Sequence, residues 1–130
     1  INLNQLQILY VVGNKIKFIE DNAFANLINL QSFTFMVEKL TKLSSNIFFG
    51  LENLSRINLI QLNLFKLYND TFINTKNLDT FYCSDNQISE IDLDAFKGLS
   101  KLRLLLLVNN KIKTVKSKLF IHLINLQHLE

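Results

Sequence analysis

The sequence predicts a solenoid of stacked copies of one short unit, in the class of mostly β, α/β-type solenoids, with a curved parallel sheet on its concave side. The stretch LQILYVVGNKI at residue 6 recurs as LRLLLLVNNKI at residue 102, which is four periods of 24 residues later. The same period fits every intervening copy without insertion or deletion. Within each phrase apolar residues alternate with others, which is the period of a strand with one buried face. A fixed period of this length indicates a repeat architecture.

The period divides the chain into five full copies, at residues 6–29, 30–53, 54–77, 78–101 and 102–125, with partial copies at both ends. We number the slots of each copy from 1 to 24, so that slot 1 is Leu6, Leu30, Leu54, Leu78 or Leu102. Residues 1–130 therefore form one solenoid segment. Because both ends fall inside a repeat and capping units usually close such arrays, we expect a fragment of a longer array. The alternative is a protomer whose ends stack on neighbouring copies.

Two further columns of the repeat carry structural predictions. Slot 19 is always phenylalanine, which predicts a stacked aromatic spine under the convex side: Phe24, Phe48, Phe72, Phe96 and Phe120. Slot 9 is asparagine in three copies, at Asn14, Asn86 and Asn110. An amide side chain both donates and accepts, so it can satisfy the backbone where the chain leaves the strand. Glu38 and Leu62 occupy this slot in copies two and three, which predicts a broken asparagine ladder and a weak or distorted turn there.

The phrase L-x-x-L-x-L-x-x-N-x-L is the signature of the leucine-rich repeat. With a 24-residue period and phenylalanine at slot 19, the whole chain resembles the extracellular "typical" class, which includes toll-like receptor ectodomains, small leucine-rich proteoglycans and secreted insect immune proteins. The resemblance implies a right-handed superhelix with an irregular convex side. Segments such as FIEDNAFANLI have room for no more than a helical turn. It also implies a recognition module of a secreted protein or receptor ectodomain, of innate-immunity or adhesion type.

In repeat arrays of this kind the concave surface is the usual binding face. Slots 3, 5 and 7 point there, and many of their residues are apolar or aromatic, as expected of an interaction site. The predicted partner-binding residues are Ile8, Tyr10, Val12, Thr34, Met36, Arg56, Asn58, Ile60, Tyr82, Leu104, Leu106 and Val108. Tyr10, Arg56 and Tyr82 are the preferred anchors, because tyrosine and arginine are enriched at binding hot spots. The alternative is that these side chains only favour strands.

The apolar character of this face favours a protein ligand or co-receptor over a sugar or a nucleic acid. A second copy of the chain could also cover the face and give a homo-oligomer. The predicted location is extracellular, and the alternative is a cytoplasmic scaffold or structural solenoid. Two glycosylation sequons begin at Asn53 and Asn69, and Asn69, on the outer turn, is the better acceptor. No stretch is long enough to span a membrane, so we expect no membrane contact by this segment.

Catalysis is not expected. Cys83 falls at slot 6, which points into the core, and His122 and His128 do not fall beside it. No zinc-binding spacing or phosphate-binding glycine loop is present, so we predict no cofactor and no metal. Net charge is +3, too mild for a nucleic-acid footprint. The lysines of copy five, Lys111, Lys113, Lys116 and Lys118, could form an anion site but are more typical of a solvated face; we expect Glu90, Asp92 and Asp94 to lie near them.

Overall fold

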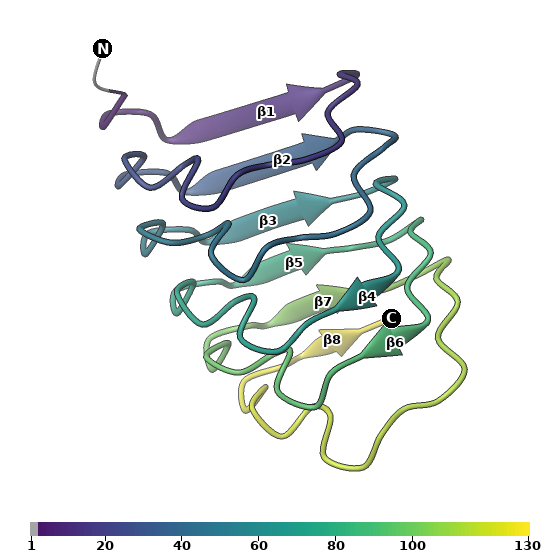
Figure 1. Ribbon diagram of the computed structural model, residues 1–130. Coiled ribbons are helices and arrows are strands. Elements are labelled where there is room, and N and C mark those ends of the chain that lie inside the picture. Colours follow the sequence, from purple (N-terminus) through teal and green to yellow (C-terminus); the bar gives the residue numbers. More distant parts are fainter. Residues whose placement is uncertain (1–2) are drawn as a thin grey trace.

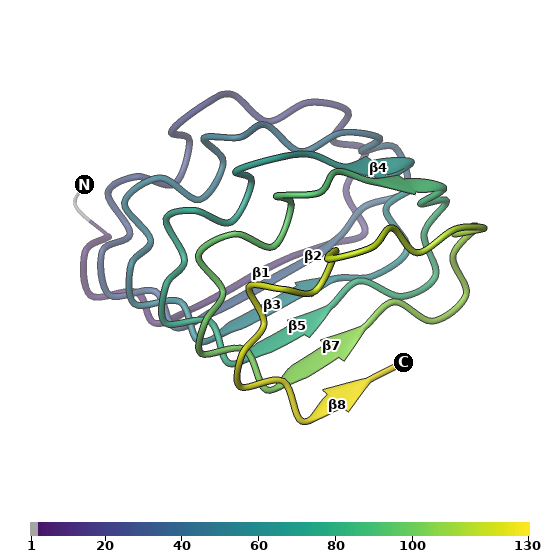
Figure 2. The same cartoon turned by 90° about the horizontal axis from the view of Figure 1, so that it is seen from below.

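A computed structural model describes residues 3–130 as a stack of coils with a parallel sheet on one side (Figure 1). Six strands form this sheet in the order β1-β2-β3-β5-β7-β8. Their bounds are Ile8–Val12 (β1), Ser32–Met36 (β2), Arg56–Leu59 (β3), Thr80–Tyr82 (β5), Leu104–Leu106 (β7) and His128–Leu129 (β8). A second, two-stranded sheet pairs β4 (Lys66–Leu67) with β6 (Glu90–Ile91) on the opposite wall of the coils (Figure 2). Residues 3–130 contain no helix.

The strand pairing has the register that the period predicts. Neighbouring strands of the large sheet pair residues 24 positions apart, so one row runs through Ile8, Ser32, Arg56, Thr80, Leu104 and His128. A slip of one residue would turn every apolar side chain away from the core. The predicted mostly β solenoid with a parallel concave sheet is therefore confirmed.

The core lies between the large sheet and the convex segments. Slot 1 is fully buried in copies two to five, at Leu30, Leu54, Leu78 and Leu102. Slots 4 and 6 send Phe33, Phe35, Ile57, Leu59, Phe81, Cys83, Leu105 and Leu107 inward. Each coil buries its apolar face against its neighbours, so stability is shared along the stack.

The convex side turns without becoming helical. In copy one, Ala25 N donates to Asn22 O and Leu27 N to Phe24 O, and the other copies repeat this pattern. These are single turns, which end because the chain must reach the next strand. Gly50, with φ of +79°, lies where one coil passes over the next. A Cβ there would approach Ala25 O to 2.6 Å, so the position requires glycine.

The slot 19 phenylalanines share one register but do not form one continuous stack. Phe48 stacks on Phe72 at 5.6 Å between ring centroids, and Phe96 stacks on Phe120 at 6.0 Å. Phe24 instead packs edge-on against Phe33 at 5.1 Å. The prediction of five stacked rings was wrong, because bulky strand phenylalanines enter the same layer of the core.

Asn86 and Asn110 each bond the backbone of the preceding copy. Asn86 Oδ1 accepts from the backbone N–H groups of Leu62 and Leu64, each at 3.1 Å, and its Nδ2 donates to Leu59 O at 2.7 Å. Asn110 Oδ1 likewise accepts from Ile88 N, in copy four, at 3.1 Å. The Leu62 side chain cannot bond an earlier coil, so the asparagine ladder is interrupted here as predicted, and its turn holds two non-glycine residues at positive φ, Gln61 at 60° and Asn63 at 69°. Leu62 packs in the core, and the next copy supplies its bonds.

Besides the predicted break at Glu38 and Leu62, the ladder also lacks Asn14. Asn14 is exposed, and its Nδ2 makes a local bond to Val12 O, so Asn14 does not act as a ladder residue towards an earlier coil. Glu38 is exposed, and Val37 beside it is buried. Asn63 compensates by donating to Glu38 O at 2.5 Å.

A second ladder, at slot 24, was missed. Asn29, Asn53, Asn77 and Asn125 each donate from Nδ2 to the slot 23 carbonyl of the preceding copy, at 2.6–2.9 Å. The column of asparagines is visible in the sequence, so its periodicity could have revealed it. These bonds hold neighbouring coils together just before each strand.

Candidate recognition surface

The outward side chains of the large sheet form the candidate site, which we call the concave face. Its central row pairs Tyr10, Thr34, Asn58, Tyr82 and Leu106 in register. The row that includes Arg56 lies one step nearer the start of each strand. The period places Ile60 and Val108 in line with the paired residues Val12 and Met36. The strands thus bring all twelve predicted contact residues to one surface.

Exposure divides the concave face into a rim and a centre. Ile8, Tyr10 and Val12 of β1 are more than half exposed, and Tyr10 reaches 66%. Met36, Ile60, Tyr82, Leu104 and Leu106 are half-buried between neighbouring strands, whereas Val108 is exposed. Thr34 is only 6% exposed, so it offers little surface to a partner.

The centre of the face holds one polar group without a partner. Asn58 Oδ1 is buried and accepts no hydrogen bond. An unsatisfied buried acceptor costs about 1–3 kcal/mol. The neighbours of Asn58 in the row, Thr34 and Tyr82, bring no donor to this oxygen.

Charge gathers at the edge where the strands begin. Arg103 Nε donates to Asp79 Oδ2 at 2.5 Å, and Arg56 lies exposed on the same edge. The hydrogen bond from Arg103, a second from Thr80 Oγ1 and the charges of Arg103 and Arg56 together hold the pKa of Asp79 below its ordinary value. This edge therefore offers two exposed guanidinium groups, of which Arg103 is paired with Asp79 and Arg56 forms no ion pair within residues 3–130, so Arg56 can pair with a partner carboxylate.

The flank bearing the small sheet carries a separate polar cluster. Lys66 Nζ contacts Asp92 Oδ1 at 2.9 Å and Glu90 Oε1 at 3.0 Å, and these bonds raise the pKa of Lys66. Burial alone would raise the pKa of Asp92, but bonds from Lys66 and the Asn69 N–H, with the charges of Lys66 and Lys116, lower it overall. Lys66 and Lys42 also approach the Tyr68 ring, at 5.2 and 5.0 Å from its centroid.

Within residues 3–130, no lysine of copy five forms an ion pair with these acids. Glu90 and Asp92 pair with Lys66 of copy three, and Asp94 lies 3.2 Å from His122 Nε2. The expected proximity is found for Lys116, whose charge acts on Asp92, but the ion pairs of Glu90 and Asp92 are made with Lys66, because the small sheet joins copy four to copy three.

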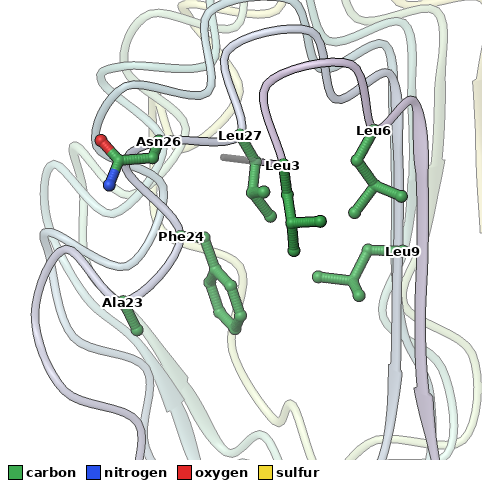
Figure 3. A pocket seen from close by; sticks show the side chains of 7 residues that line it. All are labelled: Leu3, Leu6, Leu9, Ala23, Phe24, Asn26 and Leu27. Atoms are coloured by element: carbon green, nitrogen blue, oxygen red, sulfur yellow. The ribbon is translucent and has the colours of Figure 1, made fainter. Parts of the chain in front are cut away.

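The amino-terminal coil opens a pocket of about 610 Å³ into the core. Leu3, Leu6, Leu9, Phe24 and Leu27 converge on it, whereas Asn26 points away (Figure 3). Its lining is the same apolar interior that the other coils bury against a neighbour.

Cys83 and the two histidines lie in separate parts of the described chain. Cys83 is fully buried, burial raises the pKa of its thiol, and the Asn86 amide lies against its sulfur at 3.7 Å. His128 lies at the carboxyl-terminal end and contacts Glu130 at 2.7 Å. Within residues 3–130 no cluster of His, Cys, Asp and Glu is suited to a metal ion. Residues 3–130 also contain no helix that is long and apolar enough to cross a membrane.

The fold and its regular 24-residue rows define a leucine-rich repeat solenoid. The chain belongs to this family, since the model of the BspA type leucine rich repeat region matches residues 2–129 in six copies. Comparison with curated protein sequences gives no match.

Solved structures share this fold along almost the whole chain. One is TLR13 in its complex with ssRNA13, with a TM-score of 0.94, 26% identity and coverage of 98% of this chain and 18% of that one. Another is the glycosylated Toll–Spatzle complex of Drosophila, with a TM-score of 0.82, 27% identity and coverage of 90% and 17%. The chain thus spans less than a fifth of either relative.

Proposed function

We propose that the chain is a protein-recognition segment of a secreted protein or receptor ectodomain, and that it holds a protein ligand or co-receptor on the concave face. The observation that supports this proposal is the set of aromatic and aliphatic side chains that remain exposed or half-buried on the concave face. Tyr10 and Tyr82 supply rigid contact area, and Met36 can adapt its shape. Arg56 can donate hydrogen bonds to a partner carboxylate. The remaining contacts are Ile8, Val12, Asn58, Ile60, Leu104, Leu106 and Val108.

Asn58 adds a specific expectation to this site. Its unpartnered Oδ1 lies at the centre of the face, so a small rotation on binding would let it accept a donor from the ligand. The Toll–Spatzle complex, a molecular hub in Drosophila development and innate immunity, supports a protein ligand for a related solenoid.

The test is a binding screen against purified extracellular proteins of the source organism, read out by surface plasmon resonance. A binder that uses the concave face should lose about tenfold or more in affinity with Tyr82→Ala or Arg56→Glu. Matched controls on the convex side are Phe49→Ala and Lys76→Glu, both at exposed positions. Binders that respond only to the convex variants would overturn the proposal.

A second candidate function is binding of single-stranded RNA, which the TLR13–ssRNA13 complex favours. The concave face has two tyrosines for base stacking but only Arg56 and Arg103 as cations, with Asp79 between them. We infer that protein is the better ligand, because nucleic-acid affinity depends mainly on neutralising phosphates. A single-stranded RNA that binds wild type but not Arg56→Glu would reverse this order.

The extracellular setting is tested by glycosylation. Asn69 is exposed, and its Oδ1 accepts from Asp94 N at 3.0 Å, whereas Asn53 uses its Nδ2 in the slot 24 ladder. Native protein should therefore lose mass on glycosidase treatment, and Asn69→Gln should abolish the larger part of this loss. A native mass that does not respond to the enzyme would favour the cytoplasmic alternative.

A further inference from the structure

Charge is distributed unequally along the solenoid. Residues 1–94 contain seven basic and ten acidic residues, a net charge of −3. Residues 95–130 contain seven basic residues and one acid, Glu130, a net charge of +6. Copy five alone contains five basic residues and no acid, a net charge of +5, whereas residues 1–101 have a net charge of −1.

The segment from Lys111 to Lys118, which we call the basic segment, leaves the stack. In copy four, Gln87 N, Ser89 N and Asp92 N donate to copy three at 2.8–3.0 Å, and β6 pairs with β4. Copy five repeats only the first of these bonds, from Lys111 N to Ile88 O at 2.8 Å. Figures 1 and 2 show the chain then running apart from β6.

This departure leaves an apolar side chain uncovered. Val115 occupies slot 14, where Leu43, Leu67 and Ile91 are buried in copies two to four. Val115 is 61% exposed. Within the described chain, no backbone N–H between residues 112 and 118 donates a hydrogen bond, so an extended chain could pair with this segment.

The lysines of the basic segment form no ion pairs in the described part of the chain, although Lys116 lies near enough to Asp92 for its charge to lower the pKa of that carboxyl. None of the six ion pairs found among residues 3–130 involves Lys111, Lys113, Lys116 or Lys118. The nearest acids of copy four, Glu90 and Asp92, are already held by Lys66. All four lysines are exposed.

We propose that the basic segment is a docking site for an extended acidic segment of a partner protein, separate from the concave face. Four unpaired ammonium groups would face its carboxylates, Val115 would be covered by an aliphatic side chain, and the free backbone donors would pair with its carbonyls. A nucleic acid fits less well, because single-strand binding needs exposed aromatic rings for base stacking and the basic segment has none.

The probe is a synthetic peptide that alternates glutamate with valine, and its control peptide replaces each glutamate with glutamine. Binding is measured by fluorescence anisotropy at about 0.15 M salt, where weak long-range attraction is screened. The test variant changes Lys111, Lys113, Lys116 and Lys118 to glutamate. The matched control makes the same change at Lys15, Lys17, Lys39 and Lys42, which are exposed lysines of copies one and two.

We expect the acidic peptide to bind wild type, with affinity reduced about tenfold or more in the test variant and about twofold or less in the control variant. Val115→Asn should weaken binding further than Thr114→Asn. A quadruple Lys→Gln variant repeats the test if charge reversal prevents folding. Tyr82→Ala should have no effect, which separates this site from the concave face.

Other outcomes would overturn the proposal. Equal losses in both quadruple variants would show a response to net charge alone. If a heparin fragment or an RNA oligonucleotide bound more tightly than the peptide, the ligand of the basic segment would be a polyanion and not a protein segment. Concentration-dependent sedimentation that disappears in the test variant would make the occupant a second copy, ten of whose eleven acids lie in residues 1–94.

Discussion

Copies one and four have the same residue types at key slots, yet they differ in what those residues do. Asn86 is 2% exposed and bonds Leu59, Leu62 and Leu64 of the preceding coil. Asn14, at the same slot, is exposed and bonds its own neighbour Val12. Phe96 is fully buried, whereas Phe24 is partly exposed. A repeat residue therefore acquires its role from the coil that it faces, not from its slot alone.

The largest expected difference between the two copies concerns phenylalanine. Phe96→Ala should lower the free energy of unfolding by about 3–5 kcal/mol, because it leaves a cavity beside Phe120. Phe24→Ala should cost roughly half as much or less, since its site is open on one side and can rehydrate. Urea denaturation of both variants measures the difference. Equal losses would show that slot position, not coil context, sets the contribution.

Asparagine should show the next largest difference. Asn86→Ala leaves the N–H groups of Leu62 and Leu64 without their acceptor in the interior and should cost about 3 kcal/mol. Asn14→Ala removes one exposed local bond and should change stability by about 0.5 kcal/mol or less. Hydrogen exchange adds a local measurement, because the Leu62 and Leu64 amides should lose protection only in Asn86→Ala. Unchanged protection there would contradict the bonds of Asn86 to the preceding copy.

The smallest expected effect is a pH dependence of the free energy of unfolding, which arises from Asp79 in copy four. The pKa of Asp79 is lowered in the folded state, chiefly by the bond from Arg103. Its contribution is therefore present above the unfolded value, about 3.9, and is lost as pH falls through the folded pKa. Because the pair is partly exposed, the loss should be about 1 kcal/mol or less.

Stability measured from pH 7 down to pH 2 should fall less in Asp79→Asn than in wild type. The control is Glu20→Gln, at an exposed acid of copy one. An Asp79→Asn protein with the same pH dependence as wild type would show that this pair contributes nothing to stability.

Much of the fold could be predicted, because a strict period constrains every copy at once. The strands, their parallel register and the inward direction of Cys83 all follow from alternation within a 24-residue unit. The candidate surface follows for the same reason, since slots 3, 5 and 7 must point opposite to the core. The low exposure of Thr34 could not be predicted, because exposure also depends on the size of the neighbouring side chains, which periodicity does not describe.

The sequence by itself determined the coil, the register and the identity of the core columns, because hydrophobic burial with a period of two leaves one arrangement. Only the tertiary structure decided which coil each side chain serves. Asn86 reaches back to Leu62, Lys66 rather than Lys116 holds Glu90, and the basic segment parts from its neighbour after Lys111. These bonds join neighbouring coils, whose equivalent residues are 24 positions apart in sequence. Which coil an amide bonds, and which of several lysines pairs with an acid, is therefore decided only when the coils are stacked.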